Sequence, residues 1–399
     1  MMRVTAQVAG SSAGSSTLQP LTPVAGRGIA LVRGHGSILV DSAGREYVDL
    51  ASNYGVNILG HAHPDVTAAI TAQAGLLTNA HQSFDSPVRD AFVGALGGVL
   101  PGALSRVCLV NSGSEAVEVA IKLARVATGR TRIIAMHRGY HGRTLGALSL
   151  TAAAAYRDPF GPLLPDVVHV AFDDADALDA ALDEKVAAVV VEPIQGEAGV
   201  RVPGAGYLGA VRDMCTAAGA LLVADEVQTG FRTGSVLASV TEGVVPDVVC
   251  LGKGIANGLP MGVTVCTAAV GDMMPRGGHG STFAGSPLVC AAGTATMLAV
   301  GDEALHAGVR ANGALSLQRL AGLPSATVRA VRGRGLMIGV DLRVPAGPLI
   351  AELQHRGVLA LGAGGTVIRL LPPLTIAPDV LEGALEVVAE VVENSRVTV

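Results

Sequence analysis

Short apolar runs alternate with helix-like stretches between residues 105 and 270 of this 399-residue sequence. The runs are rich in Val and Ile and do not alternate apolar with polar residues. Because strands buried on both faces have this pattern, it predicts an α/β fold with a mostly parallel sheet. The seven expected strands are residues 107–110, 133–136, 167–171, 187–191, 220–224, 247–251 and 262–266.

Between the first two of these runs, the sequence predicts a helix over residues 115–127. Apolar residues recur at i, i+3, i+4 and i+7 from Val117 to Ala124, and Gly129 lies just past the end. In a parallel α/β sheet, ligands bind outside the carboxyl ends of the strands. We therefore expect the functional loops at those ends.

The flanking regions have a different pattern. Residues 36–50 predict a hairpin with its turn at residues 41–44, and helical segments beyond residue 305 mix with short strands at residues 336–342 and 366–371. We expect the two flanks to combine into a smaller α+β domain. The predicted divisions are a flexible arm at 1–24, an N-terminal part of the small domain at 25–60, a large domain at 61–300 and a C-terminal small domain at 301–399.

Composition narrows the class of protein. The net charge of −5 gives no sign of nucleic-acid binding, and no apolar run approaches the ~20 residues of a membrane span. The five scattered cysteines and the Ser/Gly/Ala-rich N-terminus, without a signal-peptide core, indicate a cytoplasmic protein with reduced thiols. No metal site is expected. The histidines beside Gly or Pro, which are His61, His63 and His279, are interpreted as loop or interface groups.

Two apolar runs each deliver one chemically distinctive residue. Residues 221–224 lead into Asp225, and residues 247–251 lead into Lys253, which is flanked by glycines and is one of only three lysines. Pyridoxal phosphate chemistry requires an Asp that keeps the pyridine nitrogen protonated and a Lys that holds the aldehyde as a Schiff base. Either residue alone would more commonly be a helix cap or a surface group.

Two loops that follow strands add to this picture. Ser112, Gly113 and Ser114 begin the predicted helix, where backbone N–H groups and the helix dipole favour a phosphate. A capping box between Ser112 and Glu115 is the alternative, and the two interpretations are compatible. After the next strand, Tyr140 could stack on a planar cofactor and Arg143 could grip a carboxylate, although singly they would be a core and a surface residue.

Together these segments resemble the class III pyridoxal-phosphate aminotransferases over about residues 25–395. The resemblance is carried, in order, by residues 111–116, 140–145, 192–197, 225–230, Lys253 and residues 280–285. Within that class the chain is similar to the acetylornithine aminotransferase group. Residues 54–56, 274–280, 332–337 and 366–373 are similar to the branch that acts on aminoadipate or ornithine precursors linked to an amino-group carrier protein.

The resemblance implies the aspartate-aminotransferase fold (fold type I) and a set of cofactor contacts. Lys253 would form the Schiff base and move the substrate proton, and Asp225 would pair with the pyridine nitrogen. Thr282 would reach the phosphate of the neighbouring subunit, so that the active site needs a homodimer. The remaining cofactor contacts would be Gln228 to the phenolic oxygen, Tyr140 on the ring, and Ser112, Gly113 and Ser114 on the phosphate.

The resemblance also implies how two substrates of different charge are accepted. Arg369 would bind the α-carboxylate of glutamate, and Glu197 would pair with Arg369 when the other substrate is present. Arg143 would bind the remote carboxylate, and Tyr54 would line the entrance or belong to the core. Ser114 stands where many relatives have Thr, a change that preserves the hydroxyl group. Val117 stands where they have Asn, which affects only a hydrogen bond to a residue behind the site.

The expected reaction moves an amino group from glutamate to the terminal aldehyde of an N-acylated or carrier-protein-linked amino-acid semialdehyde, giving 2-oxoglutarate, as in lysine or arginine biosynthesis. The first alternative is an acetylornithine aminotransferase acting on free N-acetylglutamate semialdehyde. The others are an aminomutase or racemase, against which Arg369 and Glu197 argue, and a non-catalytic protein of this fold, against which Lys253 and Asp225 argue.

Overall fold

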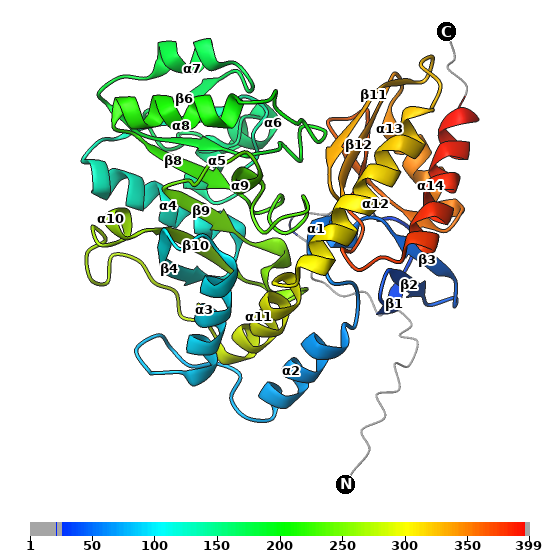
Figure 1. The fold of residues 1–399 in the computed structure, drawn as a ribbon, viewed down its shortest axis with the longest axis horizontal. Coiled ribbons are helices and arrows are strands. Elements are labelled where there is room, and N and C mark those ends of the chain that lie inside the picture. Colours follow the sequence, from blue (N-terminus) through cyan, green and yellow to red (C-terminus); the bar gives the residue numbers. More distant parts are fainter. Residues whose placement is uncertain (1–20, 22–25, 396–399) are drawn as a thin grey trace.

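The computed structural model describes residue 21 and residues 26–395, so that the predicted arm at 1–24 lies almost entirely outside the described residues. The described chain forms two lobes, and the helices α11 (Pro287–Val300) and α12 (Glu303–Ala321) lead from the larger to the smaller (Figure 1). The exact domain boundaries stay a prediction. No single described helix is both long and apolar enough to cross a membrane, and α11 and α12, which reach that measure together, are bent by 70°.

The larger lobe contains the expected seven-stranded sheet, in the order β4-β10-β9-β8-β7-β5-β6. The sheet is mostly parallel, as predicted, since only β10 runs antiparallel to its neighbours. The strands are β4 (Leu104–Val110), β5 (Arg132–Met136), β6 (Val167–Val170), β7 (Val186–Val191), β8 (Leu221–Asp225), β9 (Val248–Leu251) and β10 (Gly262–Thr267).

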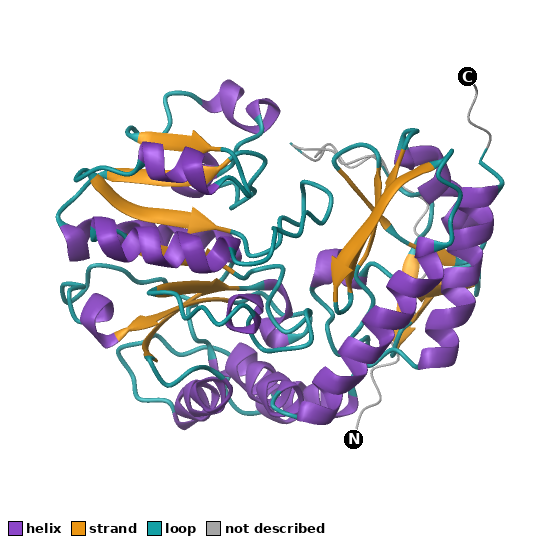
Figure 2. Cartoon of the chain, turned by 45° about the horizontal axis from the view of Figure 1, so that its top comes forward, coloured by secondary structure: helices purple, strands orange, loops and turns teal. Residues whose placement is uncertain are grey.

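Helices cover both faces of this sheet (Figure 2). In β7, Ala188 and Val190 belong to one core cluster, together with residues of α4 (Gly113–Thr128), whereas Val189 and Val191 belong to another, together with residues of α8 (Tyr207–Ala218). Because successive strand side chains point to opposite faces, both sets must be apolar. The remaining large-lobe helices include α2 (Pro64–Ala74), α3 (Pro87–Val99), α5 (Leu145–Leu150), α6 (Ala154–Arg157), α7 (Ala175–Ala181), α9 (Ala238–Thr241) and α10 (Ala268–Gly271).

The smaller lobe combines the two ends of the described chain. Its first sheet has the order β1-β2-β3-β13, in which Val358 of β13 pairs in parallel with Val48 of β3. Its second sheet has the order β11-β12-β15-β14. The elements are β1 (Leu31–His35), β2 (Ile38–Asp41), β3 (Glu46–Asp49), α1 (Ser52–Gly55), β11 (Val328–Arg334), β12 (Met337–Leu342), α13 (Ala346–His355), β13 (Val358–Leu359), β14 (Leu361–Ala363), β15 (Val367–Leu370) and α14 (Pro378–Glu393).

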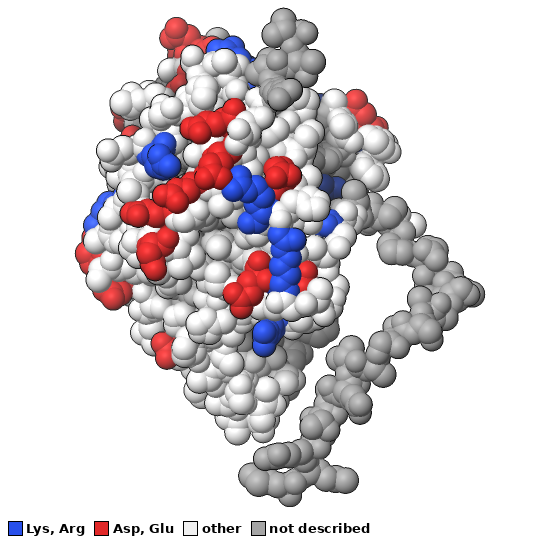
Figure 3. All heavy atoms as spheres, turned by 90° about the vertical axis from the view of Figure 1, so that its right-hand side faces the viewer, with Lys and Arg blue, Asp and Glu red and all other residues white. Residues whose placement is uncertain are grey.

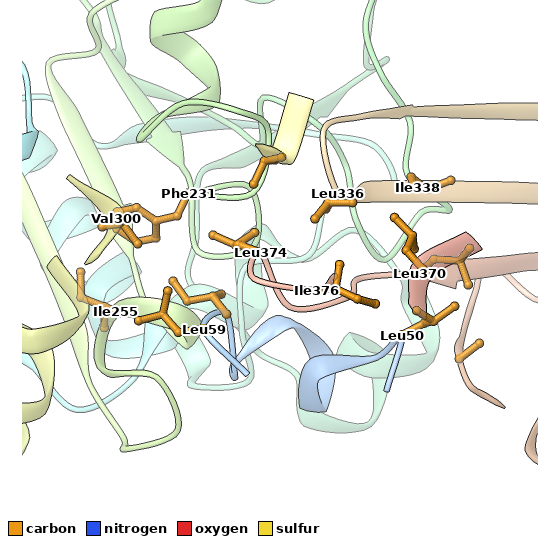
Figure 4. Packing of buried hydrophobic residues seen from close by; sticks show 14 of the residues in the cluster. Leu50, Leu59, Phe231, Ile255, Val300, Leu336, Ile338, Leu370, Leu374 and Ile376 are labelled. Atoms are coloured by element: carbon orange, nitrogen blue, oxygen red, sulfur yellow. The ribbon is translucent and has the colours of Figure 1, made fainter. Parts of the chain in front are cut away.

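One hydrophobic core continues from one lobe into the other. Leu50, Phe231, Leu336 and Leu374 belong to a single cluster of buried side chains, drawn from the N-terminal, central and C-terminal parts of the chain (Figure 4). The cluster joins side chains of both lobes around the segments that connect them. We infer that this core fixes the position of the smaller lobe against the strand ends of the larger one.

A substitution at Gly262 tests how tightly β10 packs on the loop after β4. A Cβ at this position would lie 2.0 Å from the carbonyl oxygen of Ser112, and that backbone cannot move without displacing the start of α4. We expect Gly262→Ala to lower the free energy of unfolding by about 1–3 kcal/mol, measured by urea denaturation. The control is Gly97→Ala in α3, where a Cβ meets nothing within 4 Å, and which should be neutral or stabilising. Equal effects of the two changes would contradict the close packing of β10 on this loop.

Candidate active site

A pocket of about 210 Å³ lies at the carboxyl ends of the parallel strands of the larger lobe. It brings together eight of the predicted site residues, although they come from five separate loops. Two further lining residues, His141 and Glu192, belong to the motifs at 140–145 and 192–197 but were not predicted to line the site. The eight predicted residues are Ser112, Gly113, Ser114, Tyr140, Glu197, Asp225, Gln228 and Lys253.

Asp225 ends β8 and is only 4% exposed. Its Oδ2 accepts a hydrogen bond from Nδ1 of His141 at 2.7 Å, and its Oδ1 accepts one from the backbone N–H of Val227 at 3.1 Å. Burial opposes a charge on His141, but the hydrogen bond and charge of Asp225, helped by Glu192, outweigh burial and raise the pKa of the imidazole. The structure therefore holds a buried carboxylate in a fixed orientation against an imidazole whose protonated form it favours.

Glu192 lies just beyond β7 and links two of the loops. Its carboxyl group accepts hydrogen bonds from the backbone N–H of Tyr140 at 2.9 Å and from that of Gly196 at 3.2 Å. Burial raises the pKa of this carboxyl to about 7; His141 acts against the shift and Asp225 adds to it. Glu192 thus ties the loop that carries Tyr140 to the loop that carries Glu197. The sequence contained one signal that could have identified Glu192 as a site residue. It is a polar residue that directly follows a strand of six buried residues.

Lys253 begins the short 3-10 helix η2 (Lys253–Ala256) directly after β9, with a left-handed backbone at φ 43°. Burial lowers the pKa of its amine; the charge of Glu197 opposes this shift and that of Arg369 reinforces it. A Cβ on the preceding Gly252 would lie 3.2 Å from Cα of Gly113. The lysine loop and the start of α4 therefore approach each other closely.

The structure at the start of α4 is compatible with both predicted roles of this segment, phosphate binding and helix capping. Ser112 is the N-cap, and its Oγ accepts a hydrogen bond from the backbone N–H of Glu115 at 3.2 Å. The Glu115 carboxylate accepts from the backbone N–H of Asn111 and not from that of Ser112, so the reciprocal half of the predicted capping box is shifted by one residue. At Gly113 a Cβ would meet Val227 at 2.7 Å. The backbone N–H groups of Gly113 and Ser114, which precede the capped Glu115, remain available to an anion in the pocket.

Arg369 extends from β15 of the smaller lobe and is fully buried behind the pocket lining, where it contacts two lining residues. Its Nη1 donates to Oε1 of Glu197 at 2.6 Å and to Oε1 of Gln228 at 2.9 Å. Burial acts to raise the pKa of Glu197, but Arg369 outweighs it and the pKa is lowered. Within the described chain, Nε and Nη2 of Arg369 have no partner. The guanidinium therefore has donors free for a second anion.

The other three predicted residues lie outside the pocket lining. Arg143 donates from Nε to the hydroxyl of Tyr140 at 3.2 Å, and its Cζ lies 4.6 Å from the ring centroid of Tyr156. The Tyr54 ring is 53% exposed, with its centroid 5.9 Å from Cζ of Arg369. Thr282 is exposed and does not line the pocket. The structure thus brings Arg143 and Tyr54 to the edge of the site and leaves Thr282 outside it.

The raised pKa of Glu192 makes stability depend on pH. A carboxyl whose pKa is raised from 4.5 to about 7 in the folded state stabilises the fold fully below pH 4.5, and this contribution is lost as pH rises through 7. We expect the stability of the wild type relative to Glu192→Gln to fall by up to about 3 kcal/mol over that range, measured by denaturation at each pH. Glu382→Gln, at an exposed position, is the control. A difference that does not change with pH would contradict the assignment.

Comparison with known proteins identifies relatives of the whole described chain. The aminotransferase class-III family model matches residues 23–392. The [LysW]-aminoadipate semialdehyde transaminase of Deinococcus radiodurans is 44% identical over 92% of this chain and 86% of its own length. The acetylornithine aminotransferase of Methanopyrus kandleri is 43% identical over 92% of this chain and 95% of its own.

Solved structures agree with the sequence relatives. The ornithine aminotransferase of Toxoplasma gondii superposes with a TM-score of 0.87 at 33% identity, covering 91% of this chain and 90% of its own. The acetylornithine aminotransferase of Elizabethkingia anophelis gives a TM-score of 0.81 at 31% identity, covering 95% and 96%. With its seven-stranded, mostly parallel sheet and smaller flanking sheets, the chain has the fold-type I architecture and belongs to the class III aminotransferase family.

Proposed function

We propose that this chain binds pyridoxal phosphate in the pocket at the strand ends and transfers an amino group from glutamate to the terminal aldehyde of an N-acylated amino-acid semialdehyde, giving 2-oxoglutarate. The observation that carries the proposal is the ion pair between Arg369 and Glu197, a residue that lines the same pocket as Lys253 and Asp225. An enzyme that alternates between a substrate with an extra carboxylate and one without it needs such a releasable pair.

The residues of the pocket fit the cofactor. The helix start at Ser112–Ser114 offers backbone N–H groups for a phosphate, and the buried Asp225 carboxylate suits a protonated pyridine nitrogen. The amine of Lys253 faces the same space. Bound pyridoxal phosphate supplies an electron-withdrawing ring that stabilises negative charge at the substrate Cα. Class III aminotransferases depend on this cofactor, and a related Toxoplasma structure is described with partial occupancy of PLP at its active site.

The residues of the chain then have separate tasks. Lys253, whose pKa is lowered by burial, can take and return a proton at the substrate Cα. His141 keeps Asp225 oriented through the hydrogen bond between them. Arg369 has two unpartnered donor atoms for the α-carboxylate of glutamate once Glu197 moves away. Arg143, at the edge of the pocket, can bind the carboxylate at the far end of the substrate.

The two leading acceptors differ in how the α-amino group is blocked. The Deinococcus relative is named for a semialdehyde attached to LysW, which supports a carrier-linked acceptor. The acetylornithine aminotransferases among the relatives support free N-acetylglutamate semialdehyde as the second candidate. We favour the linked acceptor.

We further propose that the enzyme works as a homodimer in the cytoplasm. Ser281, next to Thr282, accepts a hydrogen bond from Nδ2 of Asn111 at 2.7 Å, so this segment lies beside the phosphate-binding loop. Thr282 itself is exposed and outside the pocket. This position supports a role for Thr282 in the site of a neighbouring subunit.

The purified enzyme tests the proposed reaction directly. Supplied with glutamate and either acceptor, the wild type should release 2-oxoglutarate, and Lys253→Ala should reduce the rate by about 10³-fold or more because the proton carrier is removed. Lys185→Ala, in an exposed turn, is the matched control and should keep full activity. Release of 2-oxoglutarate by the Lys253 variant at the wild-type rate would refute the mechanism. A higher kcat/KM for one acceptor identifies which of the two it prefers.

Glu197→Gln separates the two half-reactions. Removing this charge leaves Arg369 unpaired when the acylated substrate is bound, but not when glutamate supplies its own carboxylate. We expect the acceptor half-reaction to slow by about tenfold or more, and the glutamate half-reaction to change by less than about threefold, both followed by cofactor absorbance in single turnovers. Glu386→Gln, exposed on α14, is the control. Equal losses in both half-reactions would contradict the proposed exchange of partners.

A further inference from the structure

A larger cleft of about 1120 Å³ opens next to the active-site pocket. Tyr140 and Glu197 line both spaces, so the cleft continues outward from the position of the reacting groups. One wall comes from the loop after β5 in the larger lobe, and the other comes from the strands and turns at residues 362–367 in the smaller lobe. Any substrate longer than glutamate would extend into this cleft.

The cleft is lined by more basic than acidic side chains. Four arginines face two acidic residues, and both acidic residues already have partners. Asp341 pairs with Arg332 at 3.0 Å and with Arg329 at 3.4 Å. Glu197 pairs with Arg369. The two arginines left over are Arg138 and Arg201.

Arg138 and Arg201 have no hydrogen-bond or ion-pair partner for their guanidinium groups among the described residues. Burial, followed by the charges of Arg138 and Arg332, lowers the pKa of Arg201, while the charges of Asp341 and Asp173 act in the opposite direction. Arg201 therefore lies close enough to two other cations to be repelled by them. Arg138 also has a left-handed backbone, with φ 66°. Strained backbone persists at binding sites, and the two guanidinium groups, which make no ion pair among the described residues, are free to pair with a ligand carboxylate.

The outer face of the smaller lobe differs from the cleft. On that face acidic and basic side chains lie interspersed over a mostly uncharged surface (Figure 3). Ion pairs such as Arg356 with Glu390 neutralise charge there. The excess of arginine in the cleft is therefore not shared by this outer face.

We propose that Arg138 and Arg201 form a second carboxylate-binding subsite, which takes the outer end of the acyl group on the amino acceptor. The preferred acceptors are then those whose acyl chain itself ends in a carboxylate, in place of an acetyl group. This proposal rests on the proposed function, because the acceptor must first enter the pocket. A planar guanidinium binds a carboxylate through two parallel charge-assisted hydrogen bonds, whereas the methyl end of an acetyl group would leave both arginines unpaired.

Two acceptors that differ only in the acyl group test the subsite. N-succinylglutamate semialdehyde ends in a carboxylate, and N-acetylglutamate semialdehyde ends in a methyl group. The wild-type holoenzyme should use the succinyl compound with at least about tenfold higher kcat/KM. In Arg138→Gln and in Arg201→Gln this preference should fall by about tenfold, while kcat/KM for the acetyl compound stays within about threefold of the wild type. Arg319→Gln, exposed near the end of α12 and outside the cleft, should leave both values unchanged.

Binding measurements test the subsite independently of whether the enzyme catalyses the proposed reaction. N-succinylglutamate and N-acetylglutamate have no free amine and cannot react with the cofactor, so calorimetric titration of the holoenzyme reports binding alone. We expect tighter binding of the succinyl compound by about tenfold, and loss of this difference in the two arginine variants. Equal affinities in the wild type, or a preference that survives both substitutions, would overturn the subsite whatever the outcome of the turnover assays. Absence of turnover with the binding preference intact would refute only the proposed reaction.

Discussion

Two pairs of largely buried acidic and basic side chains determine how the pocket is built. Asp225 is matched by His141, and Arg369 by Glu197. An unmatched ion in such surroundings would cost several kcal/mol. The pairs join segments that are remote in sequence, and one of them joins the two lobes. The same contacts that make burial tolerable therefore also set the geometry of the site.

Arg232, another buried arginine near Arg369, is also incompletely paired. Arg232 is fully buried, and burial lowers its pKa to about 9. Its Nη1 donates to the carbonyl oxygen of Pro372 at 2.8 Å, but its Nε and Nη2 have no partner within the described chain. It packs under Gly55, at the end of a left-handed turn formed by Ser52, Asn53 and Tyr54. Strained backbone of this kind costs about 1–3 kcal/mol per residue and persists where surrounding structure fixes it.

The buried strands were predictable from sequence because each leaves a local signature. Val186–Val191 is apolar throughout, since both faces of the sheet are covered, and Asp225 and Lys253 were recognisable as polar residues directly after such runs. The partners of these residues were not predictable from local pattern. His141 lies 84 residues from Asp225 in sequence, and nothing near either residue indicates their hydrogen bond. The resemblance to known enzymes did anticipate the pairing of Arg369 with Glu197, which the structure contains.

The pairing of Val48 with Val358 has a consequence for how the protein is made. The first sheet of the smaller lobe cannot be completed until almost the whole chain has left the ribosome, because its fourth strand, β13, follows α13. Contacts of such long sequence separation slow folding, since the loop-closure entropy is lost before the contact is gained. During synthesis the edge of β3 in the N-terminal hairpin stays unpaired until β13 has been made. Chaperone dependence in the cell would arise at this edge first.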